Sequence, residues 1–164
     1  MNRADAVILA EDIVSELVPL CEKIEGAGSI RRCRPIVNDI DIVCIPKFLH
    51  LDAIKERLEL LTKPARATVT GGDRYLKLSS YKGIQVDVYI ADAQTWATLL
   101  LVRTGSREHN IMLARRAREI GLKLNANGHG LTWISKDVNV PVHTEEQIFK
   151  ELGLAYREPR EREA

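Results

Sequence analysis

Residues 28–43 read GSIRRCRPIVNDIDIV and join a Gly-Ser turn with neighbouring arginines to an alternating apolar strand. Side chains alternate between the two faces of a strand, so Asp39 and Asp41 share one face while Ile40 faces an apolar layer. Two carboxylates held together on a half-buried strand repel each other and lose hydration. A divalent cation relieves this conflict, and Mg2+ takes oxygen ligands of this kind. The stretch therefore predicts a site for a metal-bound triphosphate.

The turn that precedes this strand supplies donors for phosphate oxygens. Gly28 allows close backbone approach, Ser29 offers a hydroxyl and an N–H, and Arg32 carries a forked guanidinium. Taken alone, each part has a simpler explanation, because Asp-x-Asp is common on solvated strand faces and an Arg31-Arg32 pair is typical of a surface helical turn. The close succession of the turn and the acidic strand favours the phosphate site.

A third carboxylate, Asp87, lies in the apolar run IQVDVYI at residues 84–90. Its neighbours Val86 and Val88 face the opposite side of the predicted strand. A charge in such a strand is costly unless it is paired or bound to a metal, which indicates a ligand role. An edge-strand aspartate that faces solvent is the open alternative.

Length and composition set the broad class of the protein. The chain has 164 residues, a formal net charge of +1 and 45% hydrophobic residues, which is sufficient for one packed core or two small lobes. A charge near zero gives no global sign of nucleic-acid binding. The sequence shows neither a secretory signal nor a membrane span, so we expect an intracellular protein, cytoplasmic or nucleoid-associated. Three cysteines without zinc-type spacing are expected to be free thiols, namely Cys21, Cys33 and Cys44.

Hydrophobic periodicity and turn residues predict an α+β fold. Helices are expected over residues 5–23, 51–61, 96–104, 106–120 and 144–152, and strands over 24–27, 40–45, 66–70, 74–81, 84–91, 122–125 and 131–134, with a hairpin turn at 127–130. Pro19 should kink or shorten the first helix, and the charged tail after Tyr156 should fray. This order predicts a mixed sheet flanked by helices over residues 1–93 and a smaller helix-plus-hairpin lobe over residues 94–164.

These motifs, in this order, make the chain similar to the family X DNA polymerases, the polymerase-beta-like branch of the nucleotidyltransferases. Four motifs carry the resemblance: GSIRR at 28–32 with DID at 39–41, Asp87, TGS at 104–106 with Asn110, and IF at 148–149 with YREP at 156–159. They extend over nearly the whole chain. The resemblance implies a nucleotidyltransferase palm over residues 1–93 and a nucleotide-binding thumb over residues 94–164.

The resemblance also implies a role for each matching residue. The catalytic and metal-binding residues would be Asp39, Asp41 and Asp87, holding two Mg2+ ions, with Mn2+ as an alternative. The nucleotide-binding residues would be Gly28, Ser29, Arg32, Asn38, Thr104, Gly105, Arg107 and Asn110. Among them, Ser29 and Arg32 would hold the β and γ phosphates, and Asp87 would assist loss of the primer 3′-hydroxyl proton. From the residues alone, the alternative for Arg107 is an exposed position in a first helical turn, where a cation slightly opposes the helix dipole, and this weakly favours a functional role. Asn110 is equally well explained as a solvent-facing helix residue.

The chain departs from the family pattern at several points. Val102-Arg103 stands where members commonly carry an aromatic pair, so ribonucleotide acceptance is an open expectation. Asn38 stands where a glycine commonly precedes the first aspartate. The resemblance begins at the palm, so we expect a protein without the lyase and helix-hairpin-helix domains of larger members, similar to the minimal palm-and-thumb polymerases known from a virus.

The function implied by the resemblance is DNA-directed nucleotidyl transfer, which adds a deoxynucleotide to a primer 3′-hydroxyl and releases pyrophosphate by a two-metal-ion mechanism. We expect short-gap filling in DNA repair, with a deoxynucleoside triphosphate and gapped or primer-template DNA as partners, no membrane, and a monomeric protein. Two alternatives stay open. One is a nucleotidyltransferase acting on RNA or a small acceptor, since the Gly-Ser and Asp-x-Asp core is shared across that superfamily. The other is a non-catalytic nucleic-acid-binding relative.

Overall fold

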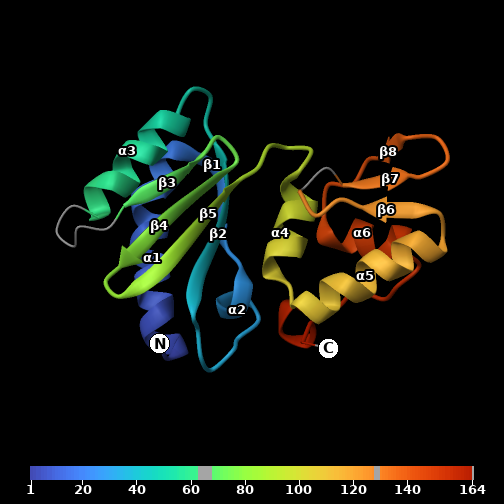
Figure 1. Cartoon of the computed structure of the whole chain (residues 1–164), viewed down its shortest axis with the longest axis horizontal. Helices are drawn as coiled ribbons and strands as arrows, with labels where there is room; N and C mark the ends of the chain where they lie inside the picture. Colours follow the sequence, from blue (N-terminus) through green and yellow to red (C-terminus); the bar gives the residue numbers. More distant parts are fainter. Residues whose placement is uncertain (63–67, 128–129, 164) are drawn as a thin grey trace.

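A five-stranded mixed sheet forms the first half of the molecule in the computed structural model, which describes residues 1–62, 68–127 and 130–163 (Figure 1). Its strands are β1 (Cys21–Gly26), β2 (Asp39–Pro46), β3 (Val69–Gly72), β4 (Tyr75–Tyr81) and β5 (Ile84–Ile90), in the spatial order β1-β2-β5-β4-β3. β2 and β5 run parallel, and the other neighbouring pairs are antiparallel. The expected α+β class with a mixed sheet is therefore confirmed.

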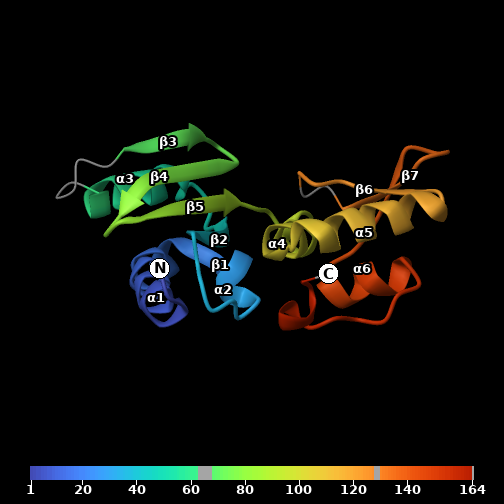
Figure 2. The same ribbon diagram turned by 60° about the horizontal axis from the view of Figure 1, so that its bottom comes forward.

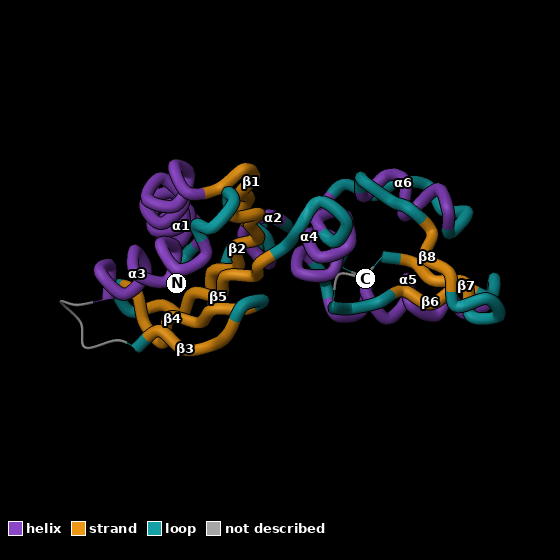
Figure 3. The backbone as a smooth tube through the Cα atoms, turned by 90° about the horizontal axis from the view of Figure 1, so that it is seen from above, coloured by secondary structure: helices purple, strands orange, loops and turns teal. Residues whose placement is uncertain are grey.

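Two helices, α1 (Arg3–Leu17) and α3 (Leu51–Thr62), cover one face of this sheet, and Figure 3 shows both on the side opposite to the second half of the chain. Side chains on the strand face toward these helices pack against them, since Ile40, Ile42 and Val88 are fully buried in one cluster with residues of both helices. This burial follows the period of two predicted from the sequence. Because these positions face the helices, the alternate positions that carry aspartates face the other side.

The second half of the chain contains α4 (Trp96–Thr104), α5 (Arg107–Glu119), α6 (Glu145–Glu151) and a three-stranded antiparallel sheet. The strands of that sheet are β6 (Leu122–Leu124), β7 (Leu131–Trp133) and β8 (Val138–Val140). These elements share their own buried cluster, which includes Leu113, Ile148 and Phe149. Figure 2 shows them grouped apart from the larger sheet, with α4 nearest to it.

Helix α4 joins the two halves by packing against the uncovered face of β2. Leu99 and Leu100 of this helix lie in one buried cluster with Val43 and Ile45 of β2 and with Ala91. Asp39 and Asp41 occupy the same strand face at the opposite end of β2. The apolar contact therefore fixes α4, and the turn that follows it, beside the acidic end of the sheet.

Several expected elements have different bounds in the structure. The first helix ends at Leu17, a short 3-10 turn that contains Pro19 follows, and Cys21 already belongs to β1, so the prediction of helix as far as residue 23 was wrong. The Gly-Ser turn is the start of a one-turn helix, α2 (Gly28–Arg31), and β8 was missed. Residues 66 and 67 of one expected strand, and residues 128 and 129 of the expected hairpin turn, lie outside the described residues.

The carboxy-terminal tail is ordered, which corrects the expectation that it frays. A 3-10 turn spans Pro159–Glu161, and the next side chain, Arg162, is completely buried. Its guanidinium donates hydrogen bonds to Glu145 Oε1 at 2.6 Å and to the Arg157 carbonyl at 2.9 Å.

Among the described residues, no helix combines the length and the hydropathy that crossing a bilayer requires.

Candidate active site

The register of the two parallel strands brings the three predicted aspartates to one face of the sheet. Asp41 of β2 lies directly opposite Asp87 of β5, and Asp39 lies opposite Gln85. Aligned positions on neighbouring strands project to the same side. The sheet therefore places Asp87 beside the Asp-x-Asp pair, and Asp87 is 5% exposed, so it is not the solvent-facing edge residue of the alternative interpretation.

Asp87 is held by two neutral donors. The Tyr75 hydroxyl donates to one carboxylate oxygen at 2.6 Å, and Gln85 Nε2 donates to the other at 2.8 Å. Burial, together with this hydrogen bond, raises the pKa of Tyr75 to about 12, which keeps the hydroxyl protonated as a donor. Tyr75 and Gln85 were not predicted from the sequence as site residues. Gln85 could have been, because it lies two residues before Asp87 and so projects from the same face of the strand.

The surroundings of the Asp41 carboxyl disfavour its ionised form. Its burial, followed by the neighbouring charges of Asp39 and Asp87, raises the pKa of Asp41 to about 7, against smaller lowering effects of Tyr89 and Arg103. Such a group gains from a nearby cation. Within the described part of the chain, no three carboxylate, imidazole or thiol groups are arranged to hold a metal ion by themselves. Mg2+ is commonly bound in proteins by one or two carboxylates together with substrate phosphates.

Gly28 is required by its contact with this carboxyl. Its φ of +55° lies in the left-handed region, and a Cβ at this position would overlap the Asp41 carboxylate. The neighbouring Ala27 N–H donates to the Asp41 carbonyl at 2.8 Å, so the turn and the strand are held against each other. The absence of a side chain at residue 28 thus lets the Gly-Ser turn lie directly on the acidic pair.

A cavity of about 870 Å³ opens between this turn, the acidic end of β2 and the first turn of α5. Its wall contains most of the predicted site residues, namely Gly28, Ser29, Arg32, Asn38, Asp39, Asp41, Gly105, Arg107 and Asn110. Two predicted site residues are not on this wall, namely Asp87 and Thr104. Thr104 is fully buried, and its Oγ1 accepts a hydrogen bond from Arg31 at 2.9 Å, so it supports the turn from behind.

In the described part of the chain, three residues on the wall of this cavity carry buried polar atoms without a hydrogen-bond partner, as do Thr98 and His109 away from it. Among the described residues, the buried atoms that lack a hydrogen-bond partner include Ser29 Oγ, Asn110 Oδ1 and Arg103 Nε. The amide nitrogen of Asn110 donates a hydrogen bond to the Val102 carbonyl at 2.8 Å, whereas the amide oxygen accepts none. Buried polar groups are nearly always paired in folded proteins. The unpaired atoms therefore indicate a polar ligand in the cavity.

The two arginines of the turn have different partners, and both side chains are mostly buried rather than exposed at the surface. The side chain of Arg31, 16% exposed, binds Glu145 of α6 through two bonds of 2.9 and 2.8 Å and so connects the turn to the second half of the chain. Glu145 is also bound by Arg162. Burial raises the pKa of Glu145, but hydrogen bonds from both arginines outweigh it and lower that pKa below its ordinary value. Arg32 lies on the cavity wall.

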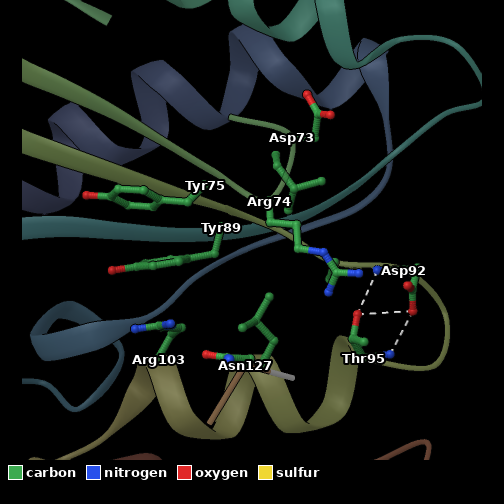
Figure 4. Close-up of a pocket in the computed structure, with 11 residues that line it drawn as sticks. Asp73, Arg74, Tyr75, Tyr89, Asp92, Thr95, Arg103 and Asn127 are labelled. Atoms are coloured by element: carbon green, nitrogen blue, oxygen red, sulfur yellow. Dashed lines mark hydrogen bonds between the residues drawn. The ribbon is translucent and has the colours of Figure 1, made fainter. Parts of the chain in front are cut away.

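A second cavity of about 920 Å³ is lined by residues of β4, β5 and α4 (Figure 4). Tyr75 and Tyr89 stack in its wall with ring centroids 5.2 Å apart, and the Arg103 guanidinium lies 4.2 Å from the Tyr89 ring centroid. Arg103 lines both cavities. Its sequence neighbours gave no sign of this stacking, because the partner strand is distant in the chain.

Comparisons with known proteins agree with this geometry. Residues 99–163 match the DNA polymerase beta thumb family. The chain is 35% identical over 118 residues to human "DNA-directed DNA/RNA polymerase mu", covering 70% of this chain and 23% of that protein. It is 26% identical over 158 residues to "Repair DNA polymerase X" of African swine fever virus (isolate Tick/South Africa/Pretoriuskop Pr4/1996), covering 94% of this chain and 90% of the viral protein.

The fold has a counterpart of known structure. Polymerase beta of Leishmania infantum, in its "Ternary P/T complex", superimposes with a TM-score of 0.81 at 18% identity, covering 100% of this chain and 77% of that one. Its "Ternary gap complex" gives a TM-score of 0.82 and covers 71% of that chain. The acidic sheet face and the adjoining Gly-Ser turn therefore belong to a fold of the polymerase-beta type. More narrowly, the chain belongs to the family X DNA polymerases.

Proposed function

We propose that this chain catalyses DNA-directed nucleotidyl transfer, adding a deoxynucleotide to a primer 3′-hydroxyl at short gaps during DNA repair. The observation that carries the proposal is the 870 Å³ cavity that joins Asp39 and Asp41 to the Gly-Ser turn and contains the unpaired Ser29 Oγ and Asn110 Oδ1. Support comes from the viral relative named as a repair polymerase and from the polymerase beta complexes with primer-template and gapped DNA.

The carboxylates of Asp39, Asp41 and Asp87 would hold two divalent ions, Mg2+ or Mn2+. When bound, such ions neutralise the triphosphate and align an in-line displacement at the α-phosphate. The protein positions its own groups for that reaction. Asp87 accepts the proton of the primer hydroxyl, while Tyr75 and Gln85 fix the orientation of its carboxylate.

The triphosphate would lie in the cavity along the Gly-Ser turn. Ser29 and Arg32 bind its β and γ oxygens, with Gly28 allowing close approach and Asn38 completing the wall. Arg107, Asn110 and the backbone at Gly105 face the nucleoside. Thr104 holds the turn in place through its hydrogen bond with Arg31.

We assign residues 1–93 to a catalytic palm and residues 94–164 to a nucleotide-binding thumb, acting as a monomer, cytoplasmic or nucleoid-associated. The separate buried clusters of the two halves support this division. A deoxynucleoside triphosphate and gapped or primer-template DNA are the proposed substrates.

Primer extension on one-nucleotide-gapped DNA, with Mg2+ or Mn2+, tests the proposal. The wild-type chain should extend the primer by one nucleotide, and Asp87→Ala should abolish extension while leaving the melting temperature within a few degrees. Equal extension by the two proteins would refute the assignment. Parallel reactions with ribonucleotides test whether Val102, on the cavity wall, admits a 2′-hydroxyl.

A further inference from the structure

The anion site at Arg32 already has an occupant from the chain itself. Arg32 Nε lies 2.8 Å from Glu163 Oε1, and Arg34 Nη1 lies 3.7 Å from Glu163 Oε2. Glu163, Arg32 and Arg34 all line the 870 Å³ cavity. A carboxylate with one cation at each oxygen thus sits where the proposed function places phosphate oxygens.

The backbone on either side of this carboxylate is fixed. The Ser106 N–H donates to the Arg162 carbonyl at 2.9 Å, and Ser106 Oγ donates to the Glu163 carbonyl at 3.1 Å. The preceding side chain, Arg162, is fully buried and bonded to Glu145. Glu163 therefore remains beside the cavity, whereas its own side chain, 35% exposed, has solvent into which it can turn.

Arg32 does not depend on Glu163 for its position. Its Nη1 donates to the Thr104 carbonyl, and its side chain is only 15% exposed. Removing the Glu163 carboxylate therefore leaves the Arg32 guanidinium facing the cavity, with its Nε–H available to another acceptor. A polyphosphate carries more negative charge than a single carboxylate and accepts more hydrogen bonds from a guanidinium.

We propose that Glu163 is a resident anion of the nucleotide cavity, which the phosphates of an incoming triphosphate must displace from Arg32 and Arg34. The carboxylate shields the arginines while the cavity holds no nucleotide and lowers the affinity for any anion that binds there. This inference rests on the proposed function for the identity of the natural ligand. The competition itself requires only that a polyphosphate enters the cavity.

Titration of metal-free protein with inorganic tripolyphosphate, followed by calorimetry, tests the competition. Glu163→Gln keeps the size of the side chain and removes its charge, and it should bind tripolyphosphate about threefold to tenfold more tightly than wild type. Glu151→Gln, an exposed glutamate at the end of α6, makes the same change in net charge and should leave the affinity unchanged. Melting curves of all three proteins establish that each is folded.

Equal or weaker binding by Glu163→Gln, or equal tightening by both variants, would overturn the inference. The same variants are then assayed for primer extension at limiting deoxynucleotide, where Glu163→Gln should lower KM with kcat unchanged. Failure of the wild-type chain to extend any primer would refute the proposed function. It would leave the tripolyphosphate result standing, so the two failures are distinguishable.

Discussion

Replacing Gly28 by alanine tests the contact on which the site is built. The residue has φ +55°, and the new Cβ would overlap the Asp41 carboxylate. Left-handed backbone costs a residue with a side chain about 1 kcal/mol or more, and moving a buried neighbour adds about as much again. We expect the free energy of unfolding to fall by about 2–3 kcal/mol, lowering the melting temperature by roughly 4–10 °C for a chain of this size.

The same substitution should affect catalysis more than stability. A displacement of about 1 Å in a positioned catalytic group costs on the order of 100-fold in rate, so gapped-primer extension by Gly28→Ala should fall by at least that factor. Gly26→Ala is the matched control, because a Cβ there meets no atom within 4 Å. If Gly28→Ala and Gly26→Ala unfold and extend primers alike, the Gly28–Asp41 contact does not hold the site together.

Three further substitutions extend the test. Glu145→Gln leaves the fully buried Arg162 without a carboxylate and leaves Arg31 with only the half-exposed Glu25. It should lower the unfolding free energy by about 3–5 kcal/mol in denaturant titrations, and a loss below 1 kcal/mol would contradict the assigned ion pairs. Because the pKa of Asp41 is raised to about 7, its ionised form is penalised in the fold. With a chelator present, the free energy of unfolding of Asp41→Asn should therefore be roughly 1–4 kcal/mol higher than that of wild type at pH 8, and this difference should shrink toward pH 4. A difference that does not depend on pH would contradict the raised pKa. Tyr75→Phe removes one donor to Asp87 and should slow single-turnover extension about tenfold without changing the circular dichroism spectrum, and an unchanged rate would show that this hydrogen bond has no role.

The alternation of side chains made the sheet faces predictable from sequence. The period of two correctly assigned Ile40 and Ile42 to the core and Asp39 to the other face, because burial of one face fixes the register of a strand. The Gly-Ser turn was also predictable, because a glycine at this position is a local feature of the sequence that indicates close backbone approach. These features depend on short segments of chain.

Other features depended on distant partners. The tail was expected to fray because it is highly charged, yet Arg162 is buried by a carboxylate on α6 and by aromatic rings of the thumb. Arg31 and Arg32 are adjacent and look alike in the sequence. Both bind residues of the second half of the chain, and only the tertiary contacts show that Arg32 also lines the cavity whereas Arg31 does not. Periodicity cannot distinguish them.

Helix and strand boundaries failed for a different reason. The apolar spacing of Leu17 and Leu20 continues the pattern of the first helix, so the strand that begins at Cys21 was absorbed into it. The strand β8 (Val138–Val140) is too short to show alternation and is recognised by its pairing with β7. In both cases sheet pairing decided the structure.

The central claim is that the acidic sheet face catalyses transfer of a nucleotide to a primer. Its most direct test is a single-turnover reaction on one-nucleotide-gapped DNA that quantifies both products with the wild-type chain and with Asp39→Ala. One pyrophosphate should be released for each primer lengthened by one nucleotide, and neither product should form with the variant or in the presence of a chelator. Primer extension that persists in Asp39→Ala, or pyrophosphate release without extension, would contradict the central claim.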